Sequence, residues 1–287
     1  MQNISNSFIS LQRKKSEMEE KIKCYFVNSF AEDGLLGNPA AVAVVDSWPS
    51  DDCMQRIALK NNLSETAFCL CLNKDEITPV FQIRWFTPGC EVPLCGHATL
   101  ASSYILFTHF FPKAQALHFK SMSGDLMVTR DDKGVINMDF PLYETERVED
   151  EKEIKAVLEA VGKEKEGKIS EIRRGIDYVV IFKEEEDVLL FNPDFEKIKR
   201  LPKDYNLLIT AKSKGGKYDF LSRCFFPKEA INEDPVTGSA HCTIAPIWAE
   251  RLKKKNLTAY QCSNRGGVLH LKVFSDRVLI GGRAVAQ

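Results

Sequence analysis

The stretch Glu91-Val-Pro-Leu-Cys-Gly-His-Ala98 occurs a second time, in altered form, as Glu233-Asp-Pro-Val-Thr-Gly-Ser-Ala240. Both copies follow the pattern E-x-P-x-x-G-x-A, and each leads into a segment rich in apolar and small residues. Such a segment is typical of a buried helix that begins after a tight glycine turn. We therefore expect one strand, one turn and one buried helix from each copy.

Two further patterns repeat in the same order. Arg84-Trp-Phe-Thr-Pro88 is echoed by Arg223-Cys-Phe-Phe-Pro227, and Gly124-Asp-Leu126 by Gly267-Val-Leu269. All three echoes are separated by a nearly constant distance of about half the chain. Repetition at a fixed period indicates a duplicated architecture. The sequence thus predicts two homologous halves.

Length and composition agree with a folded protein of two domains. The chain has 287 residues, of which 44% are hydrophobic and 28% charged, within the range of globular proteins. Lys plus Arg number 39 against 40 Asp plus Glu, so no strong field recruits nucleic acid or an anionic membrane. A small neutral or zwitterionic ligand fits this balance better.

Cysteine usage and the first residues indicate the compartment. The nine cysteines form no CxxC pair, which argues against structural zinc and a disulfide framework. No apolar run is long enough for a signal peptide or a membrane span. We expect a cytoplasmic protein with a polar extension at 1–20, a first domain at 21–122 and a second at 123–287.

Hydrophobic periodicity predicts a mixed α+β fold with many strands and few helices. Helices are expected at 51–62 and 98–110, and a solvated amphipathic helix within the charged run 144–168. Strands are expected at 40–45, 67–72, 83–86, 126–129, 135–140, 178–182, 207–210 and 278–280.

The two glycine motifs also predict a site. If both helix N-termini face one cleft between the domains, the backbone N–H groups near Gly96 and Gly238 would hold a carboxylate. His97 follows the first glycine and Ser239 the second. A helix N-terminus would favour the neutral form of His97, which suits hydrogen bonding or proton relay. The remaining histidines are expected to be packed and hydrogen-bonded.

Two acidic residues are candidates for chemistry. Asp234 stands where the first motif has Val92, and helix capping is an equally good explanation for it. Glu65 lies between an amphipathic helix and an apolar run, so it is either a surface acid or a buried one. Burial would raise its pKa towards the range of a general acid or base.

Five motifs in order carry a family resemblance. They are Gly37-Asn-Pro-Ala-Ala-Val42, Leu63-Ser-Glu-Thr-Ala-Phe68, the first R-x-F-x-P pattern and the two glycine motifs. Together they resemble the PhzF-like, or phenazine biosynthesis-like, proteins, from about residue 21 to the C-terminus. Within the family the chain is most similar to the proteins also described as MAWD-binding.

This resemblance implies the diaminopimelate epimerase-like fold, in which two pseudo-symmetric α+β domains each wrap a sheet around a central helix. It implies a cofactor-independent isomerase for a small carboxylate-bearing substrate, with no metal. By motif, Glu65 would move the proton, with His97 and Asp234 as further catalytic residues. Asn38, Gly96, Gly238 and Ser239 would bind the substrate. A homodimer and a WD-repeat partner are also implied.

Two alternatives stay open at this point. Related epimerases and racemases place a cysteine before each glycine, and here those positions hold Cys95 and Thr237. Thr237 cannot supply a second thiol, so racemisation by two cysteines is disfavoured, but a Cys95/Thr237 epimerase or dehydratase remains possible. The other alternative is a scaffold that binds proteins and has lost catalysis.

Overall fold

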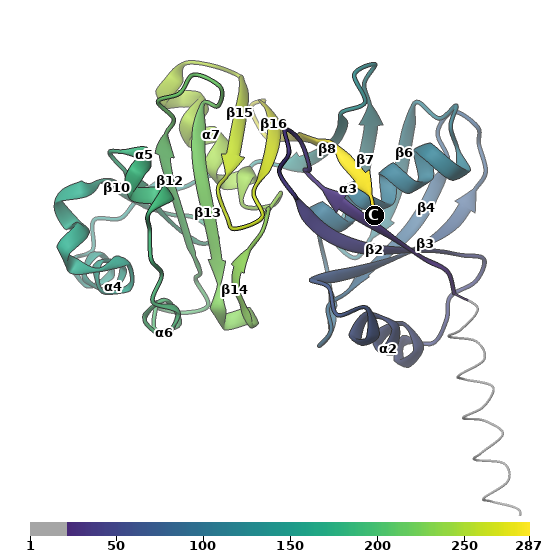
Figure 1. The fold of residues 1–287 in the computed structure, drawn as a ribbon, viewed down its shortest axis with the longest axis horizontal. Coiled ribbons are helices and arrows are strands. Elements are labelled where there is room, and N and C mark those ends of the chain that lie inside the picture. The colour runs from purple at the N-terminus through teal and green to yellow at the C-terminus, as the bar shows by residue number, and fades with distance from the viewer. Residues whose placement is uncertain (1–21) are drawn as a thin grey trace, which may run out of the picture. The chain divides into compact units, whose positions relative to one another are not determined.

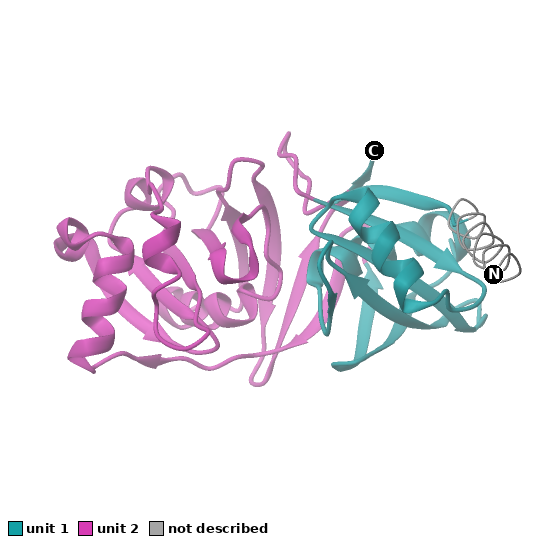
Figure 2. Cartoon of the chain, turned by 90° about the horizontal axis from the view of Figure 1, so that it is seen from below, with its two compact units in different colours: residues 1–28, 39–130, 285–287 teal, residues 29–38, 131–284 magenta. Residues whose placement is uncertain are grey.

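The computed structural model describes residues 22–287, and these fall into two compact units that are interleaved along the chain. Of the described residues, unit 1 contains those up to Asn28, Pro39–Arg130 and Val285–Gln287, and unit 2 contains Ser29–Asn38 and Asp131–Ala284 (Figure 2). The predicted extension at 1–20 lies outside the described residues. The domain boundary between 122 and 123 stays a prediction.

Unit 1 is a sheet with a buried helix against it (Figure 1). β2 runs parallel to β3, β3 antiparallel to β4, β4 parallel to β6, and β6 antiparallel to β7. β1 pairs with β2 and with β18. The strands of unit 1 are β1 (Cys24–Ser29), β2 (Asn38–Val45), β3 (Glu65–Asn73), β4 (Val80–Phe86), β5 (Glu91–Val92), β6 (Ala116–Ser121), β7 (Gly124–Arg130) and β18 (Ala284–Ala286).

Unit 1 has two main helices, one capped at both ends and one buried. Helix α2 (Asp51–Asn61) is capped by Ser50, whose side chain accepts from the Cys53 N–H, and ends at Asn62 in the left-handed conformation. Helix α3 (Gly96–Ile105) has nine buried residues and continues as a π-helical turn, Leu106–Phe110. The helix can be buried on every side because its small residues pack closely and the hydroxyls of Thr99, Ser102 and Ser103 donate to backbone carbonyls four residues earlier.

Unit 2 repeats the same order of pairings. β11 runs parallel to β12, β12 antiparallel to β13, β13 parallel to β15, and β15 antiparallel to β16. β17 then pairs with β8, with Ile280 opposite Met138. The strands are β8 (Ile136–Pro141), β9 (Glu146–Arg147), β10 (Ile169–Arg174), β11 (Tyr178–Phe182), β12 (Leu207–Lys212), β13 (Phe220–Phe226), β14 (Ile231–Asp234), β15 (Asn256–Gln261), β16 (Gly267–Val273) and β17 (Arg277–Gly282).

The buried helix of unit 2 is α7 (His241–Leu252), the counterpart of α3. Most of its residues before Ala249 are buried, and it contacts β15, β16 and β17. The shorter helices are α4 (Glu151–Val161), α5 (Glu185–Leu189) and α6 (Phe195–Ile198), with 3-10 turns η2 (Lys163–Lys168) and η3 (Pro227–Glu229). The predicted α+β class with two pseudo-symmetric halves, each a sheet with a buried helix, is confirmed.

An ion pair recurs with the repeat. In unit 1 the Arg84 guanidinium donates to both carboxylate oxygens of Glu91, at 2.7 and 2.6 Å. In unit 2 Arg223 donates to both oxygens of Glu233, at 2.7 and 2.9 Å. Each pair joins the arginine of an R-x-F-x-P pattern to the glutamate of the motif that follows. The repeated letters therefore mark a repeated bidentate contact.

One helix prediction needs correction, and the amphipathic helix predicted within 144–168 is confirmed. The helix expected at 98–110 begins two residues earlier, at Gly96, because the first turn can start directly on the glycine. The charged run 144–168 holds a shorter helix, Glu151–Val161, because Asp150 caps its start and Gly162, with a φ of 99°, ends it. A two-residue strand, Glu146–Arg147, precedes that helix, and a 3-10 turn follows it.

Candidate active site

Glu65 is the first residue of β3, and it is buried. Ala40 of β2 lies opposite it in the parallel register, and the Asn61 side chain donates to the Thr66 hydroxyl at 3.1 Å. These contacts fix the start of the strand directly after the turn that ends α2. Only 9% of Glu65 is exposed, so it is the buried acid of the two possibilities that the sequence left open.

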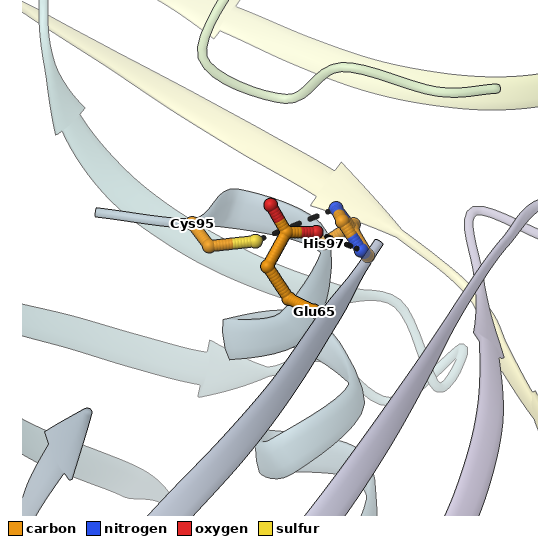
Figure 3. Close-up of side chains that lie close together, drawn as sticks. All are labelled: Glu65, Cys95 and His97. Carbon is orange, nitrogen blue, oxygen red and sulfur yellow. Dashed lines mark hydrogen bonds and ion pairs between the residues drawn. The ribbon is translucent and has the colours of Figure 1, made fainter. Parts of the chain in front are cut away.

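The side chains of Cys95 and His97 approach Glu65 from the start of α3 (Figure 3). His97 Nε2 lies 3.1 Å from Glu65 Oε2 as an ion pair, and the Cys95 sulfur lies 3.5 Å from His97 Nδ1. Cys95 is the N-cap residue and His97 the second residue of the helix. The imidazole thus contacts the thiol through one nitrogen and the carboxylate through the other.

The protonation of this cluster differs from the sequence-based expectation. Burial of the His97 ring favours its neutral form, but the negative charges of Cys95 and Glu65 outweigh burial and raise its pKa well above the usual value. Burial also raises the pKa of the Cys95 thiol, to about 11. The prediction that the environment of His97 favours its neutral form is therefore wrong, because Cys95 and Glu65 together raise its pKa by more than burial lowers it.

This arrangement can accept, hold and return a proton. The Glu65 carboxyl group and the His97 imidazole can each accept and donate a proton, and both side chains are buried. Helix α3 has no acidic residue in its first turn, and Cys95 makes no side-chain capping hydrogen bond within residues 22–287. The N-terminal turn next to Glu65 therefore presents backbone donors and the positive end of a helix dipole to an anion. Oxygen, sulfur and nitrogen donors of the cluster are also possible metal ligands.

The second glycine motif builds a different structure around Asp234. One oxygen of Asp234 accepts from the Asn38 amide at 2.8 Å and the other from the Thr237 hydroxyl at 2.5 Å. Asn38 also donates to the Val236 carbonyl at 3.0 Å. Asp234 ends β14, and the N-cap of α7 is Ala240, so the helix-capping explanation for Asp234 is wrong. Its carboxylate instead joins two segments far apart in sequence.

Gly238 and Ser239 precede α7 and do not start it. The His241 N–H bonds to the Gly238 carbonyl at 3.0 Å, and the Cys242 N–H bonds to the Ser239 carbonyl at 3.0 Å. These tight turns lead into the helix proper at His241. The expected helix N-terminus thus lies at the glycine in the first motif, but three residues later in the second.

Gln261, at the end of β15, was not anticipated by any motif. It is fully buried; its carbonyl accepts from the Thr237 N–H at 2.8 Å, and its amide donates to the Asp234 carbonyl at 2.8 Å and to the Thr237 hydroxyl at 3.2 Å. Gln261 therefore holds the turn that carries the second motif. Because β15 contains other polar residues, the sequence gives no signal that distinguishes Gln261, and its role is seen only in the fold.

Gly37 fixes the position of Asn38. Its φ is 63°, and an added Cβ would lie 2.2 Å from the Ser29 carbonyl oxygen, so no other residue fits without moving the backbone. The Arg265 side chain donates to the Gly37 carbonyl at 2.7 Å, and the Gly37 N–H donates to the Gly266 carbonyl at 2.9 Å. The Gly-Asn-Pro motif is thereby tied to the loop that precedes β16.

The prediction that the other four histidines are packed and hydrogen-bonded holds for His241; His118 and His270 make ion pairs while partly exposed, and His109 is exposed and makes a ring contact. His118 pairs with Asp125 at 2.9 Å and His270 with Glu32 at 2.8 Å. His241 is fully buried and bonds to the Thr237 carbonyl at 2.8 Å, and His109 stacks on Tyr25. Among the described histidines, His97 is the one that joins a group of possible metal ligands.

No helix in residues 22–287 has the length and apolar character needed to cross a membrane.

Comparison with known proteins gives relatives that cover nearly the whole chain. An uncharacterized isomerase of Pseudomonas aeruginosa is 40% identical over 92% of this chain and 96% of that protein. Phenazine biosynthesis-like domain-containing protein 2 of mouse is 39% identical over 92% of this chain and 96% of its own length. The crystal structure of a phenazine biosynthesis protein of the PhzF family from Enterococcus faecalis is 42% identical, covers 92% of this chain and 95% of that one, and has a TM-score of 0.80.

The family model described as phenazine biosynthesis-like protein matches residues 27–287. This match spans both units and every motif from which the resemblance was drawn. The chain therefore belongs to the PhzC/PhzF family of phenazine biosynthesis-like proteins.

Proposed function

We propose that this protein is a cofactor-independent isomerase that moves a proton between two carbons of a small carboxylic acid. Membership of the family and the isomerase name of a relative 40% identical support an isomerase-type activity. The observation that carries the proposal is the buried Glu65 carboxylate, 3.1 Å from His97 at the start of α3.

In this proposal Glu65 is the general acid and base. It removes a proton from a carbon activated by conjugation with the substrate's carboxylate, and returns it to another carbon. The imidazolium of His97 stabilises negative charge next to Glu65, and the first turn of α3 binds the carboxylate. One side chain can serve both steps because the carboxyl group formed by proton removal is itself the acid that returns a proton.

The test follows deuterium incorporation by NMR in a panel of conjugated carboxylic acids, in heavy water with a metal chelator present. We expect Glu65→Gln to slow exchange at carbon by at least about 100-fold, the usual contribution of a general acid or base. The matched control is Glu76→Gln, which removes an exposed carboxylate of the same unit. Exchange that survives Glu65→Gln unchanged would rule out the proposal.

Two observations weigh against the Cys95/Thr237 scheme. The pKa of Cys95 is about 11 because of burial, so its thiol is protonated near neutral pH. The Thr237 hydroxyl already donates to Asp234 and accepts from Gln261. Cys95→Ala in the same exchange experiment separates the schemes, since we expect it to retain turnover that Glu65→Gln loses.

Several parts of the resemblance remain predictions. These are substrate binding by Asn38, Gly96, Gly238 and Ser239, a catalytic role for Asp234, the homodimer, the WD-repeat partner and the cytoplasmic location. A non-catalytic scaffold would bind its partner equally well after loss of Glu65 and His97. Capture experiments with the Glu65→Gln protein therefore distinguish it from the isomerase.

A further inference from the structure

Three different kinds of metal ligand meet in unit 1. The donor atoms of Glu65, Cys95 and His97 all lie within 4.8 Å of one another, and all three residues are at most 9% exposed. The absence of CxxC spacing predicted no metal here, because that rule searches for ligands close together in sequence. These three come from the start of β3 and the start of α3, which only the fold brings together.

We infer that Glu65, Cys95 and His97 form a binding site for Zn²⁺, with the fourth coordination position open. Thiolate, imidazole and carboxylate together are donors that Zn²⁺ accepts, whereas Mg²⁺ and Ca²⁺ prefer oxygen alone. A dication would also compensate one carboxylate and one thiolate in a buried position. Three protein ligands with one open position are typical of zinc sites that remain accessible to other molecules.

The distances between the three donor atoms are close to those of a tetrahedral zinc site, and the His97 ring must turn to complete it. Bonds of about 2.0 to 2.3 Å to zinc place tetrahedral donors roughly 3.3 to 3.8 Å apart. The Cys95–His97 contact of 3.5 Å and the Glu65–His97 contact of 3.1 Å are near this range. They involve different ring nitrogens, so the His97 ring must turn about its Cβ–Cγ bond to bring one nitrogen between the other two donors.

A consequence for activity rests on the proposed function. Zinc would occupy the Glu65 lone pair that has to accept the proton, so the bound ion would switch proton transfer off. The isomerase activity belongs to the metal-free protein, whereas zinc binding needs no substrate and can be measured without one. The two ideas can thus fail separately.

The test is titration of the full-length, reduced and metal-free protein with Co²⁺, which reports thiolate ligation through a near-ultraviolet charge-transfer band. We expect one equivalent of Co²⁺ to give this band and Zn²⁺ to abolish it by displacement. Cys95→Ser should remove the band. His97→Gln and Glu65→Gln should each weaken binding by at least about tenfold, since even residues behind a metal ligand contribute that much. Cys90→Ser, at an exposed cysteine of the same unit, is the matched control and should change nothing.

A second measurement needs no variant and so remains valid if a substituted protein misfolds. In the unsubstituted protein, Zn²⁺ should slow alkylation of Cys95, followed by mass spectrometry, and leave alkylation of Cys90 unchanged. No charge-transfer band, a band that persists in folded Cys95→Ser protein, or alkylation of Cys95 indifferent to Zn²⁺ would each overturn the inference. Zinc binding without any proton exchange in the metal-free protein would instead overturn the proposed isomerase and leave the zinc site standing.

Discussion

At the scale of single residues, the protein places an acid, a base and a thiol in contact by means of two chain segments. Glu65 comes from the start of a strand, and Cys95 and His97 from the first residues of a helix. Burial alone would lower the pKa of the His97 ring, and the neighbouring Cys95 and Glu65 raise it instead. The chemistry of the cluster therefore depends on the pair, and changing either partner changes the other.

The first residue-scale prediction concerns pH. Because the pKa of folded His97 is raised, the stability it contributes is complete below its unfolded pKa of about 6.5 and is lost as the pH rises through the folded pKa. Glu65→Gln removes the carboxyl group that contacts the His97 ring and should therefore lower the His97 pKa. NMR titration of the His97 ring in metal-free protein measures this directly. Glu76→Gln should leave the titration unchanged, and a His97 pKa unaffected by Glu65→Gln would contradict the account.

A second prediction concerns the stability that the Gln261 side chain contributes. Gln261→Leu keeps the volume but leaves the Thr237 N–H and the Asp234 carbonyl without their buried partner. Each lost partner costs about 1 to 3 kcal/mol, so we expect the free energy of unfolding to fall by roughly 3 kcal/mol. Denaturant unfolding measures it. Gln115→Leu, at an exposed position, should change stability by at most about 0.5 kcal/mol.

How far single residues could be predicted depended on whether a motif marked them. The motifs led to Glu65 and His97, but only the fold shows that Glu65 is buried and that Cys95 and Glu65 together raise the pKa of His97. Gln261 was missed because its role arises from contacts with a turn 24 positions earlier. Sequence patterns identify local geometry, and long-range electrostatics and hydrogen bonds lie beyond them.

At the scale of elements, strands with regular apolar patterns were predicted well and irregular ones were not. β11 occurs at the predicted residues 178–182, all of them buried. β6 and β15 were missed, because Ala116–Ser121 and Asn256–Gln261 mix polar residues into partly exposed strands. The helix start at Gly96 was missed by two residues because glycine rarely signals a helix.

The repeated ion pairs give an element-scale prediction. Arg223 is more buried than Arg84, with 11% against 20% of its side chain exposed, and Arg84 keeps a second carboxylate, Asp51, at 2.8 Å. Glu233→Gln should therefore lower the free energy of unfolding by about 3 kcal/mol, and Glu91→Gln by about 1 kcal/mol. Equal losses in denaturant unfolding would show that the two copies are energetically equivalent, contrary to this expectation.

At the scale of the whole molecule, the order of the chain does not follow the division into units. Ser29–Asn38 belongs to unit 2 although most of unit 1 comes after it. Phe30 is fully buried, and its carbonyl accepts from the Val268 N–H at 3.1 Å. At the other end, the Gln287 N–H bonds to the Phe26 carbonyl at 2.9 Å in unit 1.

A whole-molecule prediction follows from Phe30. Phe30→Ala should cost about 3 to 5 kcal/mol, as for other buried phenylalanines. Its effect should fall on unit 2, so hydrogen exchange should show faster exchange in β16 than in the unsubstituted protein, while β3 and β4 stay protected. Phe26→Ala, at a position 39% exposed, is the control and should have a small effect. Loss of protection in β3 before β16 would contradict the assignment of residues 29–38.

The interleaving also bears on how the protein is made. During synthesis, residues 29–38 leave the ribosome long before the strands of unit 2 on which they pack. Val285–Gln287, which belong to unit 1, are synthesised only after residues 131–284 of unit 2. Neither unit can finish folding before segments of the other have been synthesised, so we expect both units to complete their structures late, with chaperones covering the early apolar segment until then.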